Sequence, residues 1–301
     1  MSNPEIAAIR AALAARVRPP ELADMRKMMD ANGLSRALPG DVSVTACDAN
    51  GVPAEWTVTP GADASRVVLY LHGGGYVLGS LDSHRATVAE IGRAAACRTL
   101  ALHYRLAPEH KFPAAVDDAL AGYRFLLAQG IAADEIVIAG DSAGGGLAVA
   151  ALLAIRGAGL PQPAGAWGIS PWVDMEAIGD SMTDRAAADP MVQKAGLLGM
   201  TAAYLQGADP RDPLAAPIYG DFTGLAPLLI QVGAAETLLD DSIRLARVAG
   251  AADVPVTLEI WPEMVHVWPI FHQQLAAGRK AIANAGAWIR AAMDGAPAVT
   301  R

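Results

Sequence analysis

One serine of this chain lies in a setting that suits nucleophilic chemistry. Ser142 is within the segment Gly140–Gly145, which follows a β-branched apolar run, Ile136–Ala139, and precedes an alanine-rich apolar segment, Leu147–Ile155. A strand, a sharp glycine turn and a helix form the G-x-S-x-G pattern, which holds a serine hydroxyl exposed at the apex of the turn. The N–H groups at the start of the helix then point at the site. The pattern predicts a serine nucleophile, and the alternative is an ordinary strand-to-helix turn.

A second glycine-rich segment has the composition of an oxyanion-binding loop. Residues His72 to Tyr76, with three consecutive glycines between them, follow the apolar run 66–71. Consecutive glycines leave backbone N–H groups unshielded, and one such donor is worth roughly 3 kcal/mol of transition-state stabilisation. A flexible loop is the alternative, but the later serine turn favours the catalytic interpretation.

A serine nucleophile needs a base and a group that orients the base. Of the six histidines, His266 and His272 are the two that follow a late acidic residue. His266 lies in a short loop after the strand-like segment Thr257–Trp261 and is the favoured base. His272 is expected on or near the next helix, as a surface or packing residue.

The orienting acid is expected just beyond the preceding strand. The apolar run Leu228–Val232 leads into a segment that contains Glu236, Asp240 and Asp241. Glu236 is nearest the strand end, where active-site loops of α/β sheets converge, and it is favoured. Asp240 and Asp241 suit the first turn of the next helix, where carboxylates interact well with the helix dipole. This chemistry needs no metal ion or cofactor, and we expect none.

The spacing of apolar residues predicts the elements that position these groups. Continuous apolar runs at 66–71, 99–102, 136–138 and 228–232 predict strands buried on both faces of a largely parallel sheet. Alternating patterns at 42–45 and 56–59 predict exposed antiparallel strands. Helical patterns lie between them, at 82–96, 114–128, 143–156, 240–250 and 273–292. This alternation predicts a wound α/β domain.

Residues 1–40 differ in character from the rest of the chain. Their apolar residues recur at helical spacing, as Ile6, Ile9, Leu13 and Val17. Pro20 suits the first turn of a second helix, and Gly33 is a candidate for its end. We expect this segment to be a helical cap, with an ordinary packed hairpin as the alternative. The catalytic domain would then span 41–301, and the segment 175–220, which interrupts the alternation, would be a cap insertion near the site.

The composition of the chain limits which partners and which cellular compartment are plausible. The chain has 301 residues, 53% of them hydrophobic and 18% charged, which argues for a sizeable core rather than disorder. A net charge of −8 disfavours nucleic acid and anionic lipid as partners. No run is long enough to predict a membrane-spanning helix. Cys47 and Cys97 are expected to be packing residues, which suits the reducing cytoplasm.

Several motifs, in a consistent order over roughly residues 60–275, resemble those of the bacterial hormone-sensitive-lipase-like esterases, a branch of the α/β-hydrolases. The motifs are His72–Gly79, Tyr104–His110, Gly140–Gly145 with an aspartate before the serine, Ser170–Asp174, and Asp189-Pro190. The resemblance implies an α/β-hydrolase fold with a mostly parallel sheet and an N-terminal helical cap.

The resemblance also implies roles for individual residues. Ser142 would be the nucleophile and His266 the base, and the oxyanion would be held by the backbone N–H groups of Gly74, Gly75 and Ala143. Arg105 and Glu109 would brace the oxyanion loop, and His72, Gly73 and Asp141 would support the site. The family generally has aspartate where this chain has Glu236. Glutamate is one methylene longer and still accepts the histidine N–H, while Asp240 remains the alternative acid.

These features together predict a serine carboxylesterase that hydrolyses esters of small molecules through an acyl-enzyme, and the resemblance implies short to medium acyl chains. A lactonase, amidase or thioesterase would use the same residues, and a non-catalytic ligand-binding receptor is the alternative from another class. Members of the family that the chain resembles often pair through an edge strand. Val256–Ile260 could supply one for a homodimer, and a monomer is the alternative.

Overall fold

The computed structural model describes residues 3–295, and an eight-stranded mixed sheet forms the centre of that part of the chain. The strand order is β1-β2-β4-β3-β5-β6-β7-β8. The β1–β2 and β2–β4 pairs are antiparallel, and the remaining pairs are parallel. The strands are β1 Ser43–Asp48, β2 Pro53–Val58, β3 Asp63–Leu71, β4 Cys97–Leu102, β5 Ile136–Asp141, β6 Gly165–Ile169, β7 Leu228–Gly233 and β8 Val256–Trp261.

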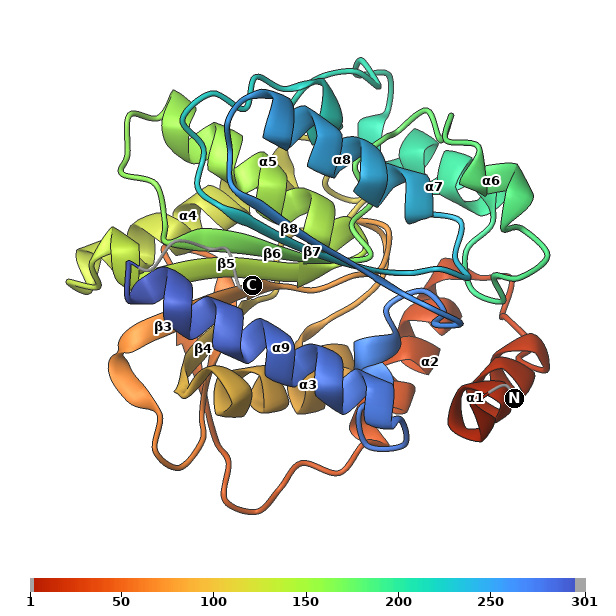
Figure 1. The fold of residues 1–301 in the computed structure, drawn as a ribbon, viewed down its shortest axis with the longest axis horizontal. Coiled ribbons are helices and arrows are strands. Elements are labelled where there is room, and N and C mark those ends of the chain that lie inside the picture. Colours follow the sequence, from red (N-terminus) through yellow and green to blue (C-terminus); the bar gives the residue numbers. More distant parts are fainter. Residues whose placement is uncertain (1–2, 296–301) are drawn as a thin grey trace.

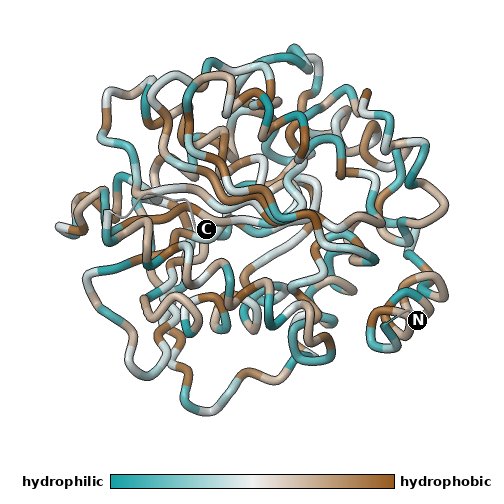
Figure 2. The backbone as a smooth tube through the Cα atoms, viewed as in Figure 1, coloured by the Kyte–Doolittle hydropathy of each residue, from teal (hydrophilic) through white to brown (hydrophobic). Residues whose placement is uncertain are grey.

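Helices cover both faces of this sheet, as the sequence pattern predicts (Figure 1). One face carries α3 and α9, and the other carries α4, α5 and α8. The bounds are α3 Leu81–Ala95, α4 Ala114–Ala128, α5 Ala143–Gly157, α8 Leu239–Ala251 and α9 Ala276–Met293. Each lies within three residues of its expected limits. The central strands are coloured largely white to brown in Figure 2, whereas teal segments gather in the loops around them.

Strand residues alternate between two hydrophobic clusters because successive side chains of a strand point to opposite faces. In β3, Leu69 and Leu71 join the cluster beneath α4 and α5, and Val68 and Tyr70 join the cluster beneath α3 and α9. Both faces are therefore buried, which explains why the strand is a continuous apolar run rather than an alternating one.

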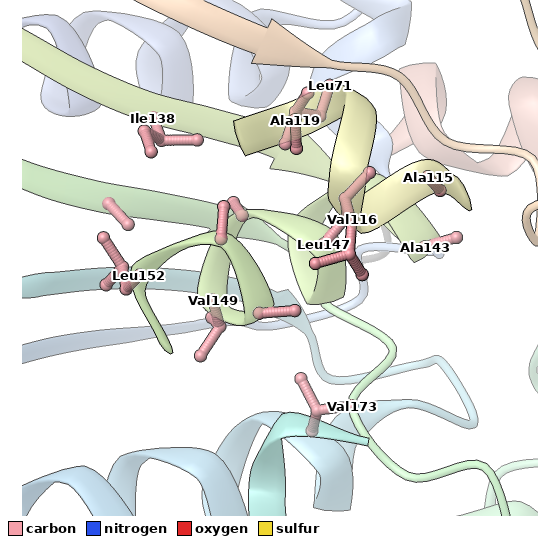
Figure 3. Close-up of a cluster of buried hydrophobic side chains, with 14 of the residues drawn as sticks. Leu71, Ala115, Val116, Ala119, Ile138, Ala143, Leu147, Val149, Leu152 and Val173 are labelled. Atoms are coloured by element: carbon pink, nitrogen blue, oxygen red, sulfur yellow. The ribbon is translucent and has the colours of Figure 1, made fainter. Parts of the chain in front are cut away.

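Helix α5 is packed tightly along one face of the sheet (Figure 3). Leu147 and Val149 are at most 2% exposed, and they belong to the same cluster as Val116 of α4 and Ile138 of β5. Burial of each large apolar side chain contributes roughly 1.5–3 kcal/mol. This packing holds the N-terminus of α5, and hence the turn before it, in a fixed place.

The sequence reasoning missed one strand, β6. Its residues, Gly165–Ile169, include two glycines and an alanine, which have low strand propensity. Close packing at both positions favours glycine. A Cβ on Gly165 would lie 2.5 Å from the Trp288 ring, and one on Gly168 would lie 3.1 Å from Pro171. Tertiary contacts therefore override local propensity here.

The N-terminal segment forms two helices, α1 Pro4–Ala14 and α2 Leu22–Leu34. Ile6 and Ile9 of α1 are buried and pack in one cluster with Met264, Val265 and Trp268. We expected Val17 to continue this apolar face, and the structure corrects this. The helix ends at Ala14, and the side chain of Val17 is 86% exposed.

Two further expectations for this segment need correction. Pro20 is not in the first turn of α2, because the helix begins at Leu22 after Glu21 as its N-cap. Gly33 does not end the helix. It lies in the last turn, where a Cβ would be 2.3 Å from the Cα of Ser83 in α3. The glycine is thus explained by the close approach of α2 and α3.

The segment 175–220 interrupts the sheet pattern with short helices. These are α6 Ser181–Asp184, α7 Lys194–Leu205 and the 3₁₀ turn η2 Pro217–Tyr219. Two further 3₁₀ turns lie outside this segment, η1 Ala133–Glu135 and η3 Trp268–Phe271. In Figure 1 both α6 and α7 lie at the same end of the sheet as α1 and α2. Among residues 3–295, no helix is long and apolar enough to span a membrane.

Candidate active site

Ser142 lies at the junction of β5 and α5 with a strained backbone. Its φ is +55° and its ψ is −121°, a conformation that a residue with a side chain rarely adopts. The surrounding backbone holds it there. The N–H of Ser142 donates to the carbonyl of Ile169 at 2.8 Å, and its own carbonyl accepts from the N–H of Trp172 at 3.0 Å. The side chain lines a cavity at the carboxyl ends of the central strands.

Close backbone contacts explain the glycines of the Ser142 turn. A Cβ on Gly140 would be 2.3 Å from the carbonyl oxygen of Gly144, and a Cβ on Gly144 would be 2.0 Å from that of Leu71. Neither contact can be relieved by rotating a side chain, because the atoms are backbone. Glycine is therefore required at both positions for the turn to pack against β3.

The glycine-rich loop after β3 lies beside Ser142. Gly74 and Gly75 have φ values of +124° and +64°, and both line the cavity. A Cβ on Gly74 would be 2.2 Å from the Leu78 carbonyl oxygen, so the loop closes on itself too tightly for a side chain. Within residues 3–295, the backbone N–H groups of Gly74, Gly75 and Ala143 have no hydrogen-bond acceptor. They remain available to an oxyanion.

Asp141 connects the glycine-rich loop to the serine turn. Its Oδ1 accepts from the N–H of Gly73 at 2.9 Å and from the Tyr70 hydroxyl at 2.8 Å, and His84 lies 3.3 Å from the carboxylate. Burial alone would raise the pKa of Asp141, but the charge and hydrogen bond of His84, with the Tyr70 hydroxyl, lower it to about 2. The carboxylate is therefore ionised and fixes the loop.

His72 is a packing residue at the base of the same loop. Its ring stacks on Tyr104 with centroids 4.3 Å apart, and its Nδ1 lies 2.9 Å from the Gly73 carbonyl oxygen. Burial and the nearby His84 lower the pKa of His72 to about 3, so the ring is neutral. Tyr70 and His84, unlike His72 and Asp141, were not predicted from the sequence.

Glu236 and His266 form a buried pair at the ends of β7 and β8. The Nδ1 of His266 is 2.6 Å from Oε2 of Glu236, and the two residues are 4% and 0% exposed. The other carboxylate oxygen accepts from the Ser170 hydroxyl at 2.7 Å and from the Gly233 N–H at 2.6 Å. Ser170 also accepts from the N–H of Val267, so it holds both sides of the pair. No sequence signal assigned this role to Ser170.

The environment of His266 favours its protonated form. Burial alone would lower the pKa of His266, but the hydrogen bond and charge of Glu236, with smaller effects from Asp189 and Asp141, outweigh it and raise the pKa. His266 lines the same cavity as Ser142. An imidazole in this position is a stronger base than a free histidine.

The other candidate acids and the second histidine lie elsewhere. The carboxylate of Asp240 accepts from the Ser181 N–H at 2.8 Å, and Asp241 accepts from the N–H of Val173 at 3.0 Å. Both are in the first turn of α8, as expected for helix-start carboxylates. His272 is buried just after η3, with an Nδ1 that has no partner among the described residues.

Within residues 3–295, the hydrogen bonds and the ion pair of Arg105 go to α4 rather than to the glycine-rich loop, so they do not support the bracing role that the resemblance implies. Its side chain and N–H instead bind Asp118 of α4, with 2.7 Å between Nη2 and Oδ1. Nearly half of the Arg105 side chain is exposed. The ion pair therefore fixes the segment after β4 to α4.

Glu109 reaches the loop only through a second residue, Arg26 of α2. The two side chains form a bidentate ion pair with distances of 2.7 and 2.8 Å. The Nε of Arg26 donates to the Val77 carbonyl at 2.8 Å, and Nη2 donates to the Ala107 carbonyl at 2.9 Å. Arg26 thus ties the N-terminal helices to the loop, a role that the sequence analysis did not assign.

The cavity over Ser142 has a volume of about 220 Å³. Its walls come from α1, α2, the glycine-rich loop, α7 and the segment after β8. Apolar side chains dominate the lining: Leu13, Met25, Met28, Met29, Leu78, Met191, Val192, Leu197, Met200, Val267 and Ile270. Asp189 fixes one wall, because it accepts from the N–H groups of Met191 and Thr237 at 2.8 Å. Among residues 3–295, no group of three or more His, Cys, Asp or Glu residues is arranged to hold a metal ion.

Comparison with known proteins identifies the family of the chain. A family model described as the alpha/beta hydrolase fold matches residues 68–270, more than half of the chain. An acetyl-hydrolase from Streptomyces hygroscopicus is 53% identical over 255 residues, which cover 84% of this chain and 83% of that protein. An ethyl acetate hydrolase from Pseudomonas putida is 33% identical over 247 residues, covering 75% and 74% of the two chains.

Solved structures resemble the whole described fold. An esterase of the bacterial hormone-sensitive lipase family matches with a TM-score of 0.95 and 46% identity, covering 97% of this chain and 99% of that one. The esterase EstE5, from a crystal soaked with p-nitrophenyl butyrate, matches with a TM-score of 0.94 and 47% identity over 97% and 100% of the two chains. The fold class and the family predicted from the sequence are thus confirmed. The chain belongs to the α/β-hydrolases and, within them, to the bacterial hormone-sensitive-lipase family of esterases, and it is a carboxylic ester hydrolase.

Proposed function

We propose that this enzyme hydrolyses esters with short to medium acyl chains through an acyl-enzyme on Ser142, with His266 as base and Glu236 as orienting acid. The observation that carries the proposal is the 2.6 Å contact between Glu236 and His266, together with the cavity that His266 shares with Ser142. The three unpartnered N–H groups of Gly74, Gly75 and Ala143 support it further.

Acylation begins when His266 takes the proton from the Ser142 hydroxyl as the oxygen attacks the ester carbonyl. The negative charge that develops on the carbonyl oxygen is held by the N–H groups of Gly74, Gly75 and Ala143. His266 then donates its proton to the leaving alcohol. Glu236 stabilises the imidazolium during this step and keeps the Nδ1 proton in place, so that Nε2 is the basic nitrogen.

Deacylation repeats the sequence with water as the nucleophile. His266 takes a proton from the water, the same N–H groups hold the second oxyanion, and Ser142 leaves with the proton returned by His266. All atoms that take part in these two steps come from the protein, the ester and water. The strained turn contributes because Ser142 is held in place before the substrate binds.

The expected acyl range follows from the cavity. A volume of about 220 Å³ is small for a ligand pocket. Met25, Met28 and Met29 of α2 present flexible apolar side chains to it, which adapt to chains of different length. The names of the relatives, an acetyl-hydrolase and an ethyl acetate hydrolase, agree with small acyl groups. Residues 1–40 and 175–220 would thus act as the cap that sets the length of the acyl chain.

The test compares the wild type with Ser142→Ala on p-nitrophenyl esters of increasing acyl length. We expect the substitution to lower kcat by about 10⁴-fold or more on every ester. We expect wild-type kcat/KM to be highest for acetyl to hexanoyl esters and to fall for longer chains. Equal rates in the two proteins would contradict the assignment of Ser142. Stoichiometric labelling by a fluorophosphonate separates the enzyme from a ligand-binding receptor.

Two further parts of the proposal concern assembly and compartment. β8 is at the edge of the sheet and pairs with β7 on one side, so it could pair with a second copy, as the family resemblance implies. Ile260 of this strand is 45% exposed. A cytoplasmic location is supported by two free thiols, of which Cys97 is buried with its pKa raised by burial to about 12. Analytical ultracentrifugation of wild type and Ile260→Lys tests the dimer, and cell fractionation tests the location.

A further inference from the structure

The cavity over Ser142 gathers positive charge that ester hydrolysis by itself does not use. Three of its lining residues are arginines, Arg16, Arg18 and Arg36. Among the described lining residues, Asp141 is the single carboxylate. The chain as a whole has a net charge of −8, so this local excess opposes the overall balance.

Asp141 forms no ion pair with these arginines among the described residues, although its charge acts on Arg36. Its carboxylate is 2% exposed, and it already accepts hydrogen bonds from Tyr70 and Gly73 beside His84. These hydrogen bonds hold the Asp141 carboxylate beneath the glycine-rich loop. The positive charge at the cavity is therefore only partly balanced by the carboxylate of its own lining.

Within residues 3–295, the side-chain hydrogen bonds of Arg18 and Arg36 go to carbonyl groups, and the side chain of Arg16 forms none. Arg18 donates to the Met191 carbonyl, and Arg36 donates to the Ser83 carbonyl at 3.3 Å and lies 6.0 Å from the centroid of the Phe271 ring. In residues 3–295, none of the three forms an ion pair. Arg26, on the neighbouring helix, instead has a bidentate carboxylate partner.

Arg16 repels each of the other two arginines: the charge of Arg18 lowers the pKa of Arg16, and the charge of Arg16 lowers that of Arg36. Burial lowers the pKa of Arg36, Asp141 partly offsets this, and Arg16 lowers it further. Burial also lowers the pKa of Arg16, and Arg18 adds to that effect. A guanidinium nevertheless stays charged in a protein. The repulsion is therefore an unfavourable interaction that a bound anion would relieve.

We propose that the preferred esters of this enzyme carry an anionic group, a carboxylate or a phosphate, which binds to Arg16, Arg18 and Arg36 while the ester carbonyl lies at Ser142. This inference rests on the proposed function. Guanidinium groups bind both anions with two parallel hydrogen bonds. The methionine side chains of α2 would contact the apolar part of the substrate between its charged end and the scissile bond. The substrate class is then an amphiphilic anionic ester rather than a neutral one.

The test uses two matched pairs of esters that differ in charge and little in shape. The first pair is 3-acetoxybenzoate and 3-acetoxybenzamide, with the charge on the alcohol side. The second is monomethyl pimelate and its primary amide, with the charge on the acyl side. Release of acid is followed in a pH-stat at low ionic strength. We expect kcat/KM to be about tenfold higher for the anionic member of at least one pair, chiefly through a lower KM.

Substitution of the arginines should remove this preference. In Arg16→Gln/Arg18→Gln and in Arg36→Gln, we expect the ratio of anionic to neutral kcat/KM to fall toward one. Arg36→Lys, which keeps the charge, should retain part of it. The matched control is Arg124→Gln/Arg247→Gln, which removes two exposed charges from α4 and α8 and should leave the ratio as in the wild type. High salt should weaken the preference in the wild type because it screens exposed charges.

The outcomes separate the two proposals. If the wild type hydrolyses the neutral esters with Ser142 dependence but shows no anionic preference in either pair, the inference is wrong and the proposed function stands. A preference that persists in both sets of arginine variants also overturns the inference. If Ser142→Ala is as active as the wild type, or no ester is hydrolysed, the proposed function fails and the inference fails with it.

Discussion

At the scale of single residues, the protonation of the proposed base, His266, depends on the carboxylate of Glu236. Burial opposes protonation of His266, and the hydrogen bond and charge of Glu236 more than compensate. The pKa of His266 is therefore raised, and the pH at which the imidazole becomes a free base moves upward from its usual value near 6.5.

Replacement of Glu236 by glutamine should change the pH profile as well as the rate. In the wild type, we expect the ascending limb of kcat/KM to have its midpoint above pH 6.5, because the base form appears only above the raised pKa of His266. In Glu236→Gln, the carboxylate charge is lost, so the limb should move to lower pH and kcat should fall by about 10²–10⁴-fold. An unchanged midpoint would contradict the coupling. Asp240→Asn is the control, because Asp240 binds Ser181 and not His266.

The residues of the site differ in how visible they are in the sequence. Ser142 and the glycines around it are contiguous, so a local motif reveals them. Glu236 was favoured by its place after a strand, and the structure puts it against His266. Ser170 and Arg26 act through partners 66 and 83 residues away, and such contacts are created by the fold rather than by local sequence.

At the scale of elements, α5 and α2 position the reacting groups in different ways. α5 is held by apolar packing on the sheet. α2 is tied by the polar contacts of Arg26 to two loops at the carboxyl end of the strands. The first kind of contact should control stability, and the second should control the geometry of the oxyanion loop.

Truncation of the α5 core should destabilise the protein. Leu147 is fully buried in the cluster of Figure 3. We expect Leu147→Ala to lower the free energy of unfolding by about 3 kcal/mol, since it leaves a cavity as well as losing apolar contact. Urea denaturation measures this. Ile243→Ala on α8, where the side chain is 39% exposed, should cost less than about 1 kcal/mol.

Loss of the α2 anchor should affect turnover more than stability. Arg26→Gln removes the bonds to the Val77 and Ala107 carbonyls and the pair with Glu109. We expect kcat/KM to fall about tenfold, because the loop that carries Gly74 and Gly75 is less well positioned, with a change in melting temperature of only a few degrees. Lys27→Gln on the same helix is the control, and its exposed pair with Asp24 should contribute little. A normal kcat/KM in Arg26→Gln would refute this role.

At the scale of the whole molecule, one buried carboxylate should make stability depend on pH. Burial, with the nearby Asp174, raises the pKa of Asp241 to about 7, although hydrogen bonds from Val173 and Asp174 and the charge of Arg244 oppose the rise. The unfolded chain has the ordinary value near 3.9. The folded state therefore binds more protons between about pH 4 and 7, and this contribution to stability is lost as pH rises through that window.

Asp241→Asn should remove this dependence. We expect the difference in melting temperature, wild type minus variant, to decrease as the pH is raised from 5 to 8. The reason is that the wild type loses a proton at this position and the variant has none to lose. Thermal unfolding at four pH values measures the difference. Asp184→Asn, at an exposed position of α6, corrects for general effects of charge. A difference that does not change with pH would show that Asp241 does not titrate in this range.

Most of the sheet and its helices could be predicted from the sequence because their patterns are local. The continuous runs of β3, β5 and β7 indicate strands buried on both sides, and the structure agrees. β6 was missed because its glycines are explained by Trp288 and Pro171, which are brought close only by folding. The contact of Gly33 with Ser83 and the pairing of Arg105 with Asp118 were missed for the same reason.

The two ends of the described chain lie on different sides of the molecule, and this matters for attaching the enzyme to a surface. Asp294, just after α9, pairs with Arg66 near the start of β3, whereas Ser142 is at the opposite, carboxyl end of the strands. Helix α1 instead contributes Leu13 to the lining of the cavity over Ser142. Immobilisation through the end of α9 should leave the entrance open to large substrates. Immobilisation through α1 should obstruct it, and a bulky ester should report the difference as a lower rate.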